Sequence, residues 1–292
     1  MKLNVLILGY GEMGHAMEFL LADKHNITIW TRSGIVNIEE QVFRSDLILF
    51  CIPVNAHPQI CQRILPFLST NTLCLTIAKG LDENGMTAAQ VLNTILTTRF
   101  PYGVIYGPMI SEEIRSGRFA FANVSLSEVK NFITVQDLFQ RTRLICYHSN
   151  DMAGMCWSAV LKNVYAILFG ISDELKLGDN IRGYLMVVAL AELSQITTIL
   201  GGCASTPYEY SGLGDLTTTA TSPNSHHYQL GCKLASGQYS ELSGEGIHTL
   251  SMVAKYQLID SQNFPLFSLV NSIVNKPENL LGFIDEYFEK LY

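Results

Sequence analysis

The sequence has little charge, and the charge it has is not predominantly positive. Only 15% of the 292 residues are charged, against 48% hydrophobic, and 26 acidic residues outnumber 19 basic ones to give a net charge of −7. A chain of this length and composition has enough apolar side chains for one large domain or two ordinary ones. The acidic balance argues against a nucleic-acid-binding surface and against a basic face for a membrane. A small anionic ligand needs only local positive charge, so that class of ligand stays open.

The sequence also lacks paired cysteines. Its seven cysteines are odd in number and scattered, and none forms a C-x-x-C pair. This spacing argues against a zinc site and against a disulfide framework. We therefore expect reduced thiols, no metal, and a cytoplasmic protein.

Long hydrophobic runs without charge are missing as well. The run at residues 3–8 is short and leads straight into a glycine loop, unlike a signal peptide. The strongest membrane candidate, residues 181–200, contains Arg182 and Glu192, which favours a buried helix over a membrane span. We therefore expect no membrane insertion, and we find no internal repeat or low-complexity linker.

The beginning of the chain carries a glycine motif between two strand-like runs. The run K-L-N-V-L-I-L at 2–8 is followed by G-Y-G-E-M-G at 9–14, a helical pattern at 15–23 and a second apolar run at 27–30. In a βαβ unit, Gly9 permits the tight turn, Gly11 lets the backbone approach a pyrophosphate, and Gly14 lets helix and strand pack closely. The N-terminus of the helix then offers free N–H groups to the phosphates. The motif predicts dinucleotide binding; the alternative is a glycine-rich turn in an unrelated α/β fold.

The residues after the second strand bear on the choice of cofactor. The segment Trp30-Thr31-Arg32-Ser33 has no acidic residue for the ribose hydroxyls of NAD. Arg32 and Ser33 could instead contact a 2′-phosphate, which favours NADP over NAD. The alternative is that Arg32 is a solvated surface charge.

Three more apolar runs, at 47–52, 73–78 and 104–106, each lead into a short distinctive segment. The segments are Pro53-Val54, Lys79-Gly80 and Gly107-Pro108. Ligands of open parallel sheets bind beyond the carboxyl ends of the strands. This position places Lys79 at the mouth of the site, although a solvent-exposed loop lysine is the alternative.

After about residue 150, strand-like runs give way to helical periodicity. The predicted helices span 152–175, 181–201, 228–235 and 249–256, with short helices to the end of the chain. We therefore predict an α/β fold, with a Rossmann-type doubly wound sheet in residues 1–150 followed by a mostly α-helical C-terminal domain in residues 151–292.

One lysine lies in the first of these helices, within S-A-V-L-K-N at 158–163. Burying Lys162 as a cation is costly unless a partner compensates its charge. In a partly dry cleft its pKa would fall, and it could transfer a proton during hydride transfer between a nicotinamide and a carbonyl group. Asp215, in G-L-G-D-L at 212–216, is a candidate partner, although it could simply cap the following helix.

Together these motifs resemble the soluble NAD(P)-dependent glycerol-3-phosphate dehydrogenases over nearly the whole chain. The shared segments include C-I-P at 51–53, A-K-G-L-D at 78–82, G-P-M-I-S-E-E-I-R-S-G at 107–117, A-V-L-K-N-V-Y-A-I at 159–167, L-G-D-N-I-R at 177–182 and G-E-G-I-H-T at 244–249. The resemblance implies an oxidoreductase that interconverts dihydroxyacetone phosphate and sn-glycerol 3-phosphate and feeds phospholipid biosynthesis. The implied substrate is a small phosphorylated three-carbon compound. The sequence does not fix the oligomeric state; a homodimer is the assembly we consider.

The resemblance also assigns roles to individual residues. Lys162 matches the catalytic acid/base, Lys79 a second active-site lysine, and Asp215 the acid that positions lysine and substrate. The implied cofactor contacts are Gly9, Gly11, Glu12, Met13, Gly14, Arg32, Pro53, Lys79, Ser111 and Glu245. The implied substrate contacts are Lys79, Gly107, Asn163, Thr219, Ser225, His226 and His227.

The chain departs from the family where the substrate phosphate is held. Family members read roughly S-R-N-R there, and this chain reads Ser225-His226-His227. Histidine is only partly charged near neutral pH, unlike arginine. If the protonated histidines hold phosphate, the KM of a phosphorylated substrate should rise between pH 6 and 8. The alternatives are a different substrate and, less favoured by the spacing, a metal site.

Three further departures concern the surroundings of the site. Met109 stands where the family has a serine or threonine, and the stretch from 31 to 46 is shorter than in the family. The segment Val187-Val188-Ala189 stands in place of T-R-G, so we expect Glu192 to lose a partner. The sequence therefore leaves three functions open: a glycerol-3-phosphate dehydrogenase, a reductase of another small carbonyl compound, and a non-catalytic NAD(P)-binding homologue.

Overall fold

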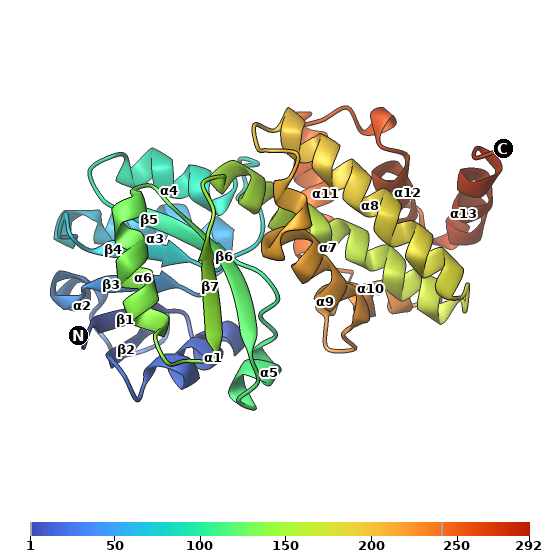
Figure 1. The fold of residues 1–292 in the computed structure, drawn as a ribbon. Helices are drawn as coiled ribbons and strands as arrows, with labels where there is room; N and C mark the ends of the chain where they lie inside the picture. The colour runs from blue at the N-terminus through green and yellow to red at the C-terminus, as the bar shows by residue number, and fades with distance from the viewer. Residues whose placement is uncertain (1, 241) are drawn as a thin grey trace.

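A computed structural model describes residues 2–240 and 242–292 of the chain (Figure 1). Its N-terminal half is built on one seven-stranded sheet, and its C-terminal half is helical. The strands are β1 (Asn4–Leu8), β2 (Asn26–Trp30), β3 (Leu47–Phe50), β4 (Leu73–Thr76), β5 (Tyr102–Tyr106), β6 (Ala120–Leu126) and β7 (Leu144–His148). The predicted fold class, a Rossmann-type sheet followed by a mostly helical part, is confirmed.

The order of the strands is β2-β1-β3-β4-β5-β6-β7. All neighbours pair in parallel except β5 and β6, which are antiparallel. The sequence predicted the first five strands but missed β6 and β7. Two predicted strands end early, at Phe50 and Thr76, because the residues after them turn out of the sheet. The carboxyl ends of β1, β3, β4 and β5 therefore meet at one edge, where a parallel sheet binds its ligand.

Helices cover both faces of the sheet. Alternate residues of each strand point to opposite faces, so the near-continuous apolar runs supply both layers of core. One face packs against α1 (Glu12–Leu21), α5 (Ser111–Arg115) and α6 (Phe132–Phe139). The other face packs against α2 (Ile38–Arg44), α3 (His57–Ile64) and α4 (Ala88–Leu96).

The helical half is organised around α7 (Met152–Glu174). Residues 154–172 of this helix are all buried, and helices on several sides pack against it. The remaining helices are α8 (Asp179–Ile199), α9 (Asp215–Thr221), α10 (His226–Ala235), α11 (Glu245–Tyr256), α12 (Pro265–Asn275) and α13 (Leu280–Glu289). The π-helix Tyr210–Gly214 runs directly into α9. Because α7 is surrounded, polar residues along it lie inside the protein.

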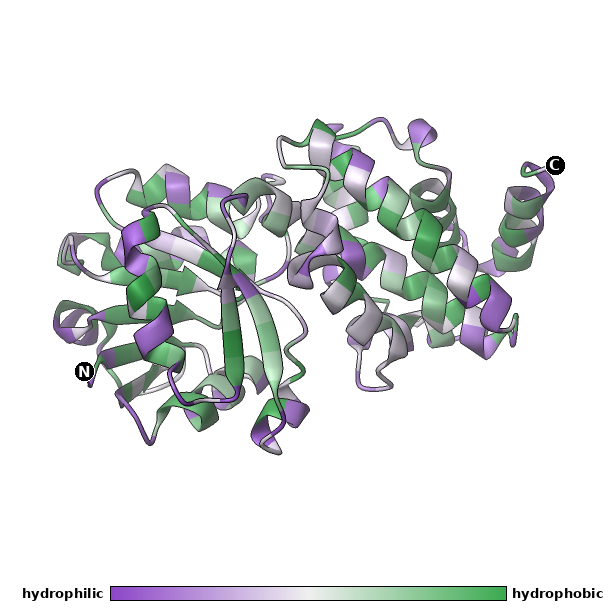
Figure 2. Ribbon diagram, viewed as in Figure 1, coloured by the Kyte–Doolittle hydropathy of each residue, from purple (hydrophilic) through white to green (hydrophobic). Residues whose placement is uncertain are grey.

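Within the described residues, one helix is long and apolar enough to cross a membrane, and it is α7 rather than the segment 181–200. The whole apolar window of α7 is buried inside the protein, and Figure 2 shows its hydrophobic residues among those of neighbouring helices. A core helix meets the same criteria, so length and composition alone do not make α7 a membrane span.

The expectation that Glu192 loses its partner is wrong. Its carboxylate accepts hydrogen bonds from the Leu266 and Phe267 backbone N–H groups, at 2.7 and 2.9 Å, and from the Tyr165 hydroxyl at 2.8 Å. Burial raises the pKa of Glu192, while these three hydrogen bonds favour its charged form. Glu192 therefore holds the N-terminus of α12 against α7 and α8.

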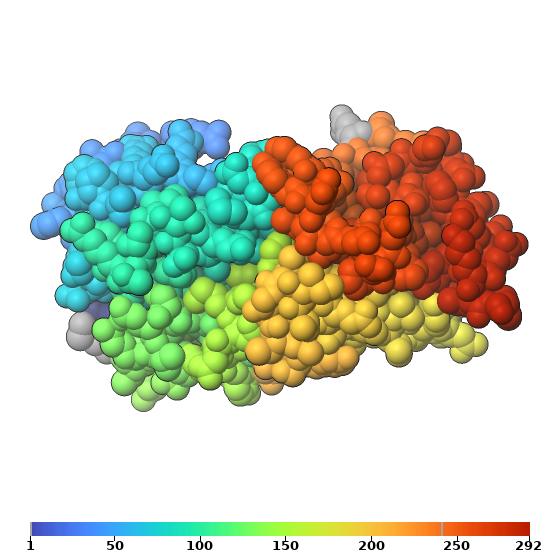
Figure 3. Space-filling model, turned by 90° about the horizontal axis from the view of Figure 1, so that it is seen from above, coloured from blue at the N-terminus to red at the C-terminus, as the bar shows by residue number. Residues whose placement is uncertain are grey.

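The two halves are in contact with each other (Figure 3), and α7 packs against β5, β6 and α4 of the N-terminal half. His248 Nε2 of α11 donates to the Leu81 carbonyl at 3.1 Å, and the Tyr256 hydroxyl donates to the Glu83 carbonyl at 2.7 Å. These bonds join the C-terminal half to the loop after β4. They fix one wall of the space between the halves.

Candidate active site

A cavity of about 520 Å³ lies between the carboxyl ends of the strands and the helices α7, α9, α10 and α11. Several residues that the sequence singled out meet there. From the cofactor set, the cavity is lined by Gly11, Glu12, Met13, Pro53, Lys79, Ser111 and Glu245. From the substrate set, it is lined by Asn163, Thr219, Ser225 and His227, together with Lys162 and Asp215.

Lys162 points from α7 toward this cavity with its stem in the core. The residue is only 5% exposed. Its Nζ donates to Thr219 Oγ1 at 2.5 Å and forms an ion pair with Asp215 Oδ1 at 3.1 Å. An ammonium group has three N–H donors, and the described residues supply these two acceptors. One N–H therefore remains for an oxygen atom of a substrate.

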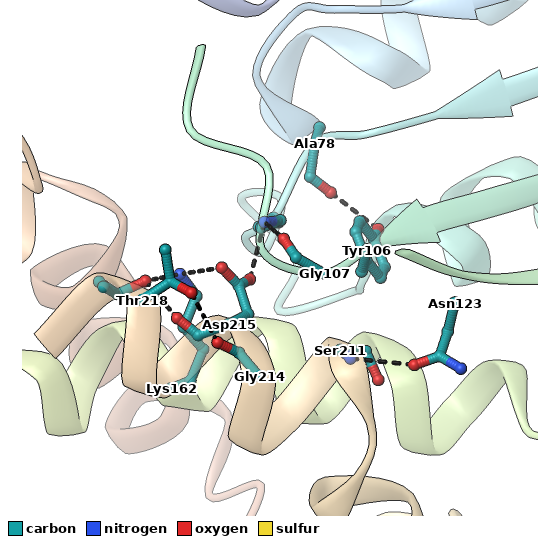
Figure 4. A network of polar contacts seen from close by, with 11 residues as sticks. Ala78, Tyr106, Gly107, Asn123, Lys162, Ser211, Gly214, Asp215 and Thr218 are labelled. Carbon is teal, nitrogen blue, oxygen red and sulfur yellow. Dashed lines mark hydrogen bonds and ion pairs between the residues drawn. The ribbon is translucent and has the colours of Figure 1, made fainter. Parts of the chain in front are cut away.

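Asp215 joins the two lysines across the cleft (Figure 4). Its second oxygen, Oδ2, accepts from Lys79 Nζ at 2.7 Å, and Lys79 also donates to the Gly107 carbonyl at 3.1 Å. Asp215 is the first residue of α9, which Gly214 precedes, and no side chain in the described part of the chain caps that helix. The alternative reading of Asp215 as a helix cap is thus wrong, and its carboxylate instead bridges Lys79 from the sheet and Lys162 from α7.

The environment changes the acidity of Lys162. Burial lowers its pKa from the usual 10.5 to about 8; the Asp215 carboxylate opposes this effect, and the Lys79 charge adds to it. An amine with this pKa exchanges its proton readily near neutral pH. That property suits a general acid or base better than an ordinary exposed lysine would.

Buried hydrogen bonds fix the loop that carries Lys79. The Tyr106 hydroxyl donates to the Ala78 carbonyl at 2.8 Å (Figure 4). The Ala78 N–H donates to Thr76 Oγ1 at 3.1 Å. His57 lies behind them, with Nδ1 donating to the Pro53 carbonyl at 3.0 Å and Nε2 accepting from the Thr76 hydroxyl at 3.0 Å. Burial lowers the pKa of His57 to about 4, so the ring is neutral and can accept this bond. The network connects the loops that follow β3 and β4.

The glycine loop fits a dinucleotide. Gly9 has φ of +96°, and a Cβ there would lie 2.6 Å from the Cys51 carbonyl oxygen. A Cβ on Gly14 would lie 2.3 Å from the Gly9 carbonyl oxygen, so the helix can approach the strand only without a side chain. At Gly11 nothing lies within 4 Å of the added atom, and this residue lines the cavity. The backbone is thus open at the position where a pyrophosphate would approach the start of α1.

The other predicted cofactor residues differ in their placement. Glu245 is partly buried at the start of α11, and a Cβ on Gly80 would lie 1.8 Å from its Oε2, so a side chain at residue 80 would displace the Glu245 carboxylate. Burial raises the pKa of Glu245. Glu12 is paired with Arg115 at 2.7 Å, which offsets its charge at the helix N-terminus. Arg32 is exposed and lies outside the cavity, two residues after the end of β2.

Of the two histidines, only His227 lines the cavity. The neighbouring His226 is exposed, and its Nε2 donates to the Ser243 carbonyl at 2.9 Å. Burial and the nearby Lys162 charge lower the pKa of His227 to about 3. His227 is therefore neutral at pH 6 to 8, which argues against the proposal that the histidine pair binds phosphate as cations. Gly107 also lies outside the cavity lining, although its carbonyl holds Lys79.

Sequence reasoning missed several lining residues. Glu112, Thr218, Ser222 and Asn224 all line the cavity but were not proposed as site residues. The polar run T-S-P-N-S at 221–225 was the available indication, because it lies between Asp215 and the histidines. Within the described chain, no group of three or more His, Cys, Asp or Glu side chains is placed to hold a metal ion.

Comparison with known proteins agrees with this arrangement. The family model for the N-terminus of NAD-dependent glycerol-3-phosphate dehydrogenase matches residues 33–131, and the model for its C-terminus matches residues 151–285. The chain belongs to this family. The match therefore covers strands β3 to β6, with Lys79 in the loop after β4, and the helices that carry Lys162 and Asp215.

Relatives of known name span almost the same length as this chain. Glycerol-3-phosphate dehydrogenase [NAD(P)+] from Acaryochloris marina is 32% identical, with 90% of this chain and 87% of that protein covered. The enzyme of the same name from Gloeobacter violaceus is 30% identical, with 93% and 92% covered. The crystal structure of glycerol-3-phosphate dehydrogenase from Coxiella burnetii has a TM-score of 0.88 at 24% identity and covers 99% of both chains. At that identity the structural match supports the fold alone.

Proposed function

We propose that this chain is an NAD(P)H-dependent oxidoreductase that interconverts dihydroxyacetone phosphate and sn-glycerol 3-phosphate. The observation that carries the proposal is the buried Lys162, which lines the cleft with one N–H unused and a pKa of about 8. Family membership and the names of the relatives support the same reaction.

In this proposal Lys162 is the proton donor. A bound reduced nicotinamide would supply hydride to the carbonyl carbon of the substrate. As negative charge develops on the carbonyl oxygen, the Lys162 ammonium group donates a proton to it and becomes a neutral amine. Solvent then protonates this amine again. In the opposite direction the neutral amine accepts the proton of the alcohol. Asp215 orients the lysine, and Lys79 adds positive charge near the developing oxyanion.

The cofactor would lie along the edge of the sheet. Gly9, Gly11 and Gly14 would accommodate its pyrophosphate at the start of α1, and Pro53, Ser111 and Glu245 would contact its nicotinamide half. Arg32 lies beyond β2, where the adenosine ribose of a Rossmann ligand is bound. Its guanidinium favours NADPH over NADH in our proposal.

A second candidate is a reductase of a small unphosphorylated carbonyl compound. The neutral state of His227 favours this candidate, because a neutral imidazole does not attract a phosphate group as a cation would. Among the described lining residues the only Lys or Arg side chains are Lys79 and Lys162, and both already form ion pairs with Asp215. Loss of a bidentate arginine–phosphate contact costs roughly 2–4 kcal/mol, or about 30- to 1000-fold in affinity. A neutral polar end of the cleft suits a hydroxyl group without such a loss.

The deciding experiment follows the absorbance of NADPH and of NADH with dihydroxyacetone phosphate as the only carbonyl compound, and with dihydroxyacetone in parallel. Turnover with the phosphorylated compound alone supports the main proposal and identifies the cofactor. Turnover with the unphosphorylated compound alone supports the second candidate. Cofactor binding without turnover on a panel of small carbonyl compounds would refute both and leave a non-catalytic NAD(P)-binding homologue.

We also propose a cytoplasmic location, as suits reduced thiols and a soluble metabolic enzyme. The homodimer stays a proposal as well. Size-exclusion chromatography with light scattering tests it directly.

A further inference from the structure

The segment before Asp215 is an unusual piece of backbone. Residues Tyr210–Gly214 form a π-helix, which continues into α9. π-Helical turns are rare and occur often at functional sites. A shift in this turn would move Asp215 directly, since Asp215 is the next residue in the chain.

The helical half supplies part of the support for this turn. The Glu209 carbonyl accepts from the N–H groups of Gly212 and Gly214, at 3.3 and 3.2 Å. A Cβ on Gly212 would lie 2.2 Å from the Pro207 carbonyl oxygen, so the turn packs tightly on the preceding residues. These contacts shape the turn, but they do not tie it to the sheet that carries Lys79.

The sheet supplies three further contacts. Asn123, at the centre of β6 and 3% exposed, accepts from the Ser211 N–H through Oδ1 at 3.1 Å (Figure 4). The ring of Tyr210 stacks on Phe121 of β6, with centroids 6.1 Å apart and planes at 15°, and on Tyr147 of β7, at 5.0 Å and 18°. Such stacked pairs contribute to stability beyond the area they bury.

We propose that Asn123 and Tyr210 are positioning residues for the reaction: they fasten the π-helix to the sheet, and so hold the Asp215 carboxylate between Lys79 and Lys162. The sheet and the helical half each supply one of these lysines, so the two halves must keep a fixed separation for both contacts. Asn123 and Tyr210 act at that junction without lining the cavity. This inference rests on the proposed proton transfer by Lys162.

The pKa of Lys162 depends on the position of the Asp215 carboxylate, so it reports whether that carboxylate has moved. The charged and titratable groups that line the cavity together with Lys162 are Glu12 of α1, Cys51 after β3, Lys79 after β4, Glu112 of α5, Asp215 of α9, His227 of α10 and Glu245 of α11. Of these, Asp215 raises the pKa of Lys162 and Lys79 lowers it. Displacement of Asp215 should therefore lower the pKa of Lys162 further, by about one pH unit or more.

The test compares the variants Tyr210→Ala and Asn123→Ala with wild type and with Tyr208→Ala. Tyr208 is an exposed aromatic residue two positions away, so its variant is a matched control. The pKa of Lys162 is measured by NMR of lysines labelled at Cε, with the Lys162→Met spectrum to assign the signal. This measurement needs no substrate, so it distinguishes failure of this inference from failure of the proposed function. Tyr210 lies at the surface, which keeps the test available if Asn123→Ala does not fold.

We expect the pKa of Lys162 to fall in the Tyr210→Ala and Asn123→Ala variants. In the Tyr208→Ala control it should be the same as in wild type. Tyr210→Phe, which keeps the stacked ring, should restore the wild-type value. In the reductive assay, kcat should fall at least tenfold, its alkaline limb should move to lower pH, and the KM for the cofactor should change less than twofold. An unchanged Lys162 pKa in both alanine variants would overturn the inference, as would a Tyr210→Phe variant that behaves like Tyr210→Ala.

Discussion

Replacing Lys162 with methionine should abolish most of the activity. It should also remove a contribution that destabilises the folded state below about pH 8. Methionine keeps an unbranched apolar chain of similar length but has no proton to transfer. Loss of a general acid typically lowers kcat by about 10²- to 10⁴-fold. Cofactor affinity should stay close to that of wild type, because the glycine loop precedes α1 and belongs to the sheet half, whereas Lys162 belongs to α7.

The effect on stability follows from the pKa of Lys162. Folding lowers this pKa from 10.5 to about 8, and at about 1.4 kcal/mol per pH unit this difference corresponds to about 3 kcal/mol. A lowered lysine pKa makes the folded state less stable below pH 8, where both states carry the charge. The cost fades between pH 8 and 10.5, as the folded state loses its proton first, and is absent above 10.5. Other losses in the variant, such as the missing partner of Asp215, do not share this pH dependence.

Urea unfolding of wild type and Lys162→Met from pH 7 to 10.5 measures this directly. The free energy of unfolding of the variant minus that of wild type should decrease by about 3 kcal/mol over that interval. The exposed Lys233 of α10 provides a control, and Lys233→Met should show neither the kinetic nor the pH-dependent effect. A difference that stays constant with pH, or a kcat within tenfold of wild type, would refute the reasoning.

Three further predictions test other parts of the structure. Arg32→Ala should weaken NADPH binding about tenfold more than NADH binding in fluorescence titrations, and equal effects would mark Arg32 as a surface charge. Glu192→Gln should lower the free energy of unfolding by about 1–3 kcal/mol and leave kcat unchanged. The reason is that the Glu192 carboxylate accepts three hydrogen bonds through two oxygens, and an amide has only one oxygen. An unchanged midpoint of urea unfolding would contradict this account. Gly80→Ala should displace Glu245, whose Oε2 would lie 1.8 Å from the new Cβ, and raise the Kd of the cofactor. Unchanged binding would remove Glu245 from the proposed cofactor site.

Some parts of the fold could be predicted from the sequence, and others could not. The first five strands were predictable because each combines a continuous apolar run with a distinctive loop. Strand β6 contains alanine, asparagine and serine, and β7 is a half-exposed edge strand, so neither has the apolar run typical of a central strand. The helices α7 and α8 were predictable to within two residues because their apolar periodicity is long.

The residues of the site also differ in how far the sequence could predict their roles. Lys162 stands out in the sequence because it lies within an apolar run, and a charged lysine is costly to bury unless a partner compensates its charge. The neutral state of His227 and the exposure of His226 could not be foreseen, because both depend on which side of α10 faces the cleft and on the lysines nearby. The support from Asn123 was equally hidden, since 88 residues separate it from Ser211.

The glycine turn is therefore predictable from the sequence, as are the order of sheet and helices and the lysine in an apolar helix, since each depends on local spacing and residue type. Only the folded chain shows that Asp215 bridges two lysines from different halves and that the π-helix before it contacts β6 and β7. Charge state and proton transfer depend on distances of a few ångströms between residues far apart in the chain. Those distances are fixed only when the sheet and the helices pack together.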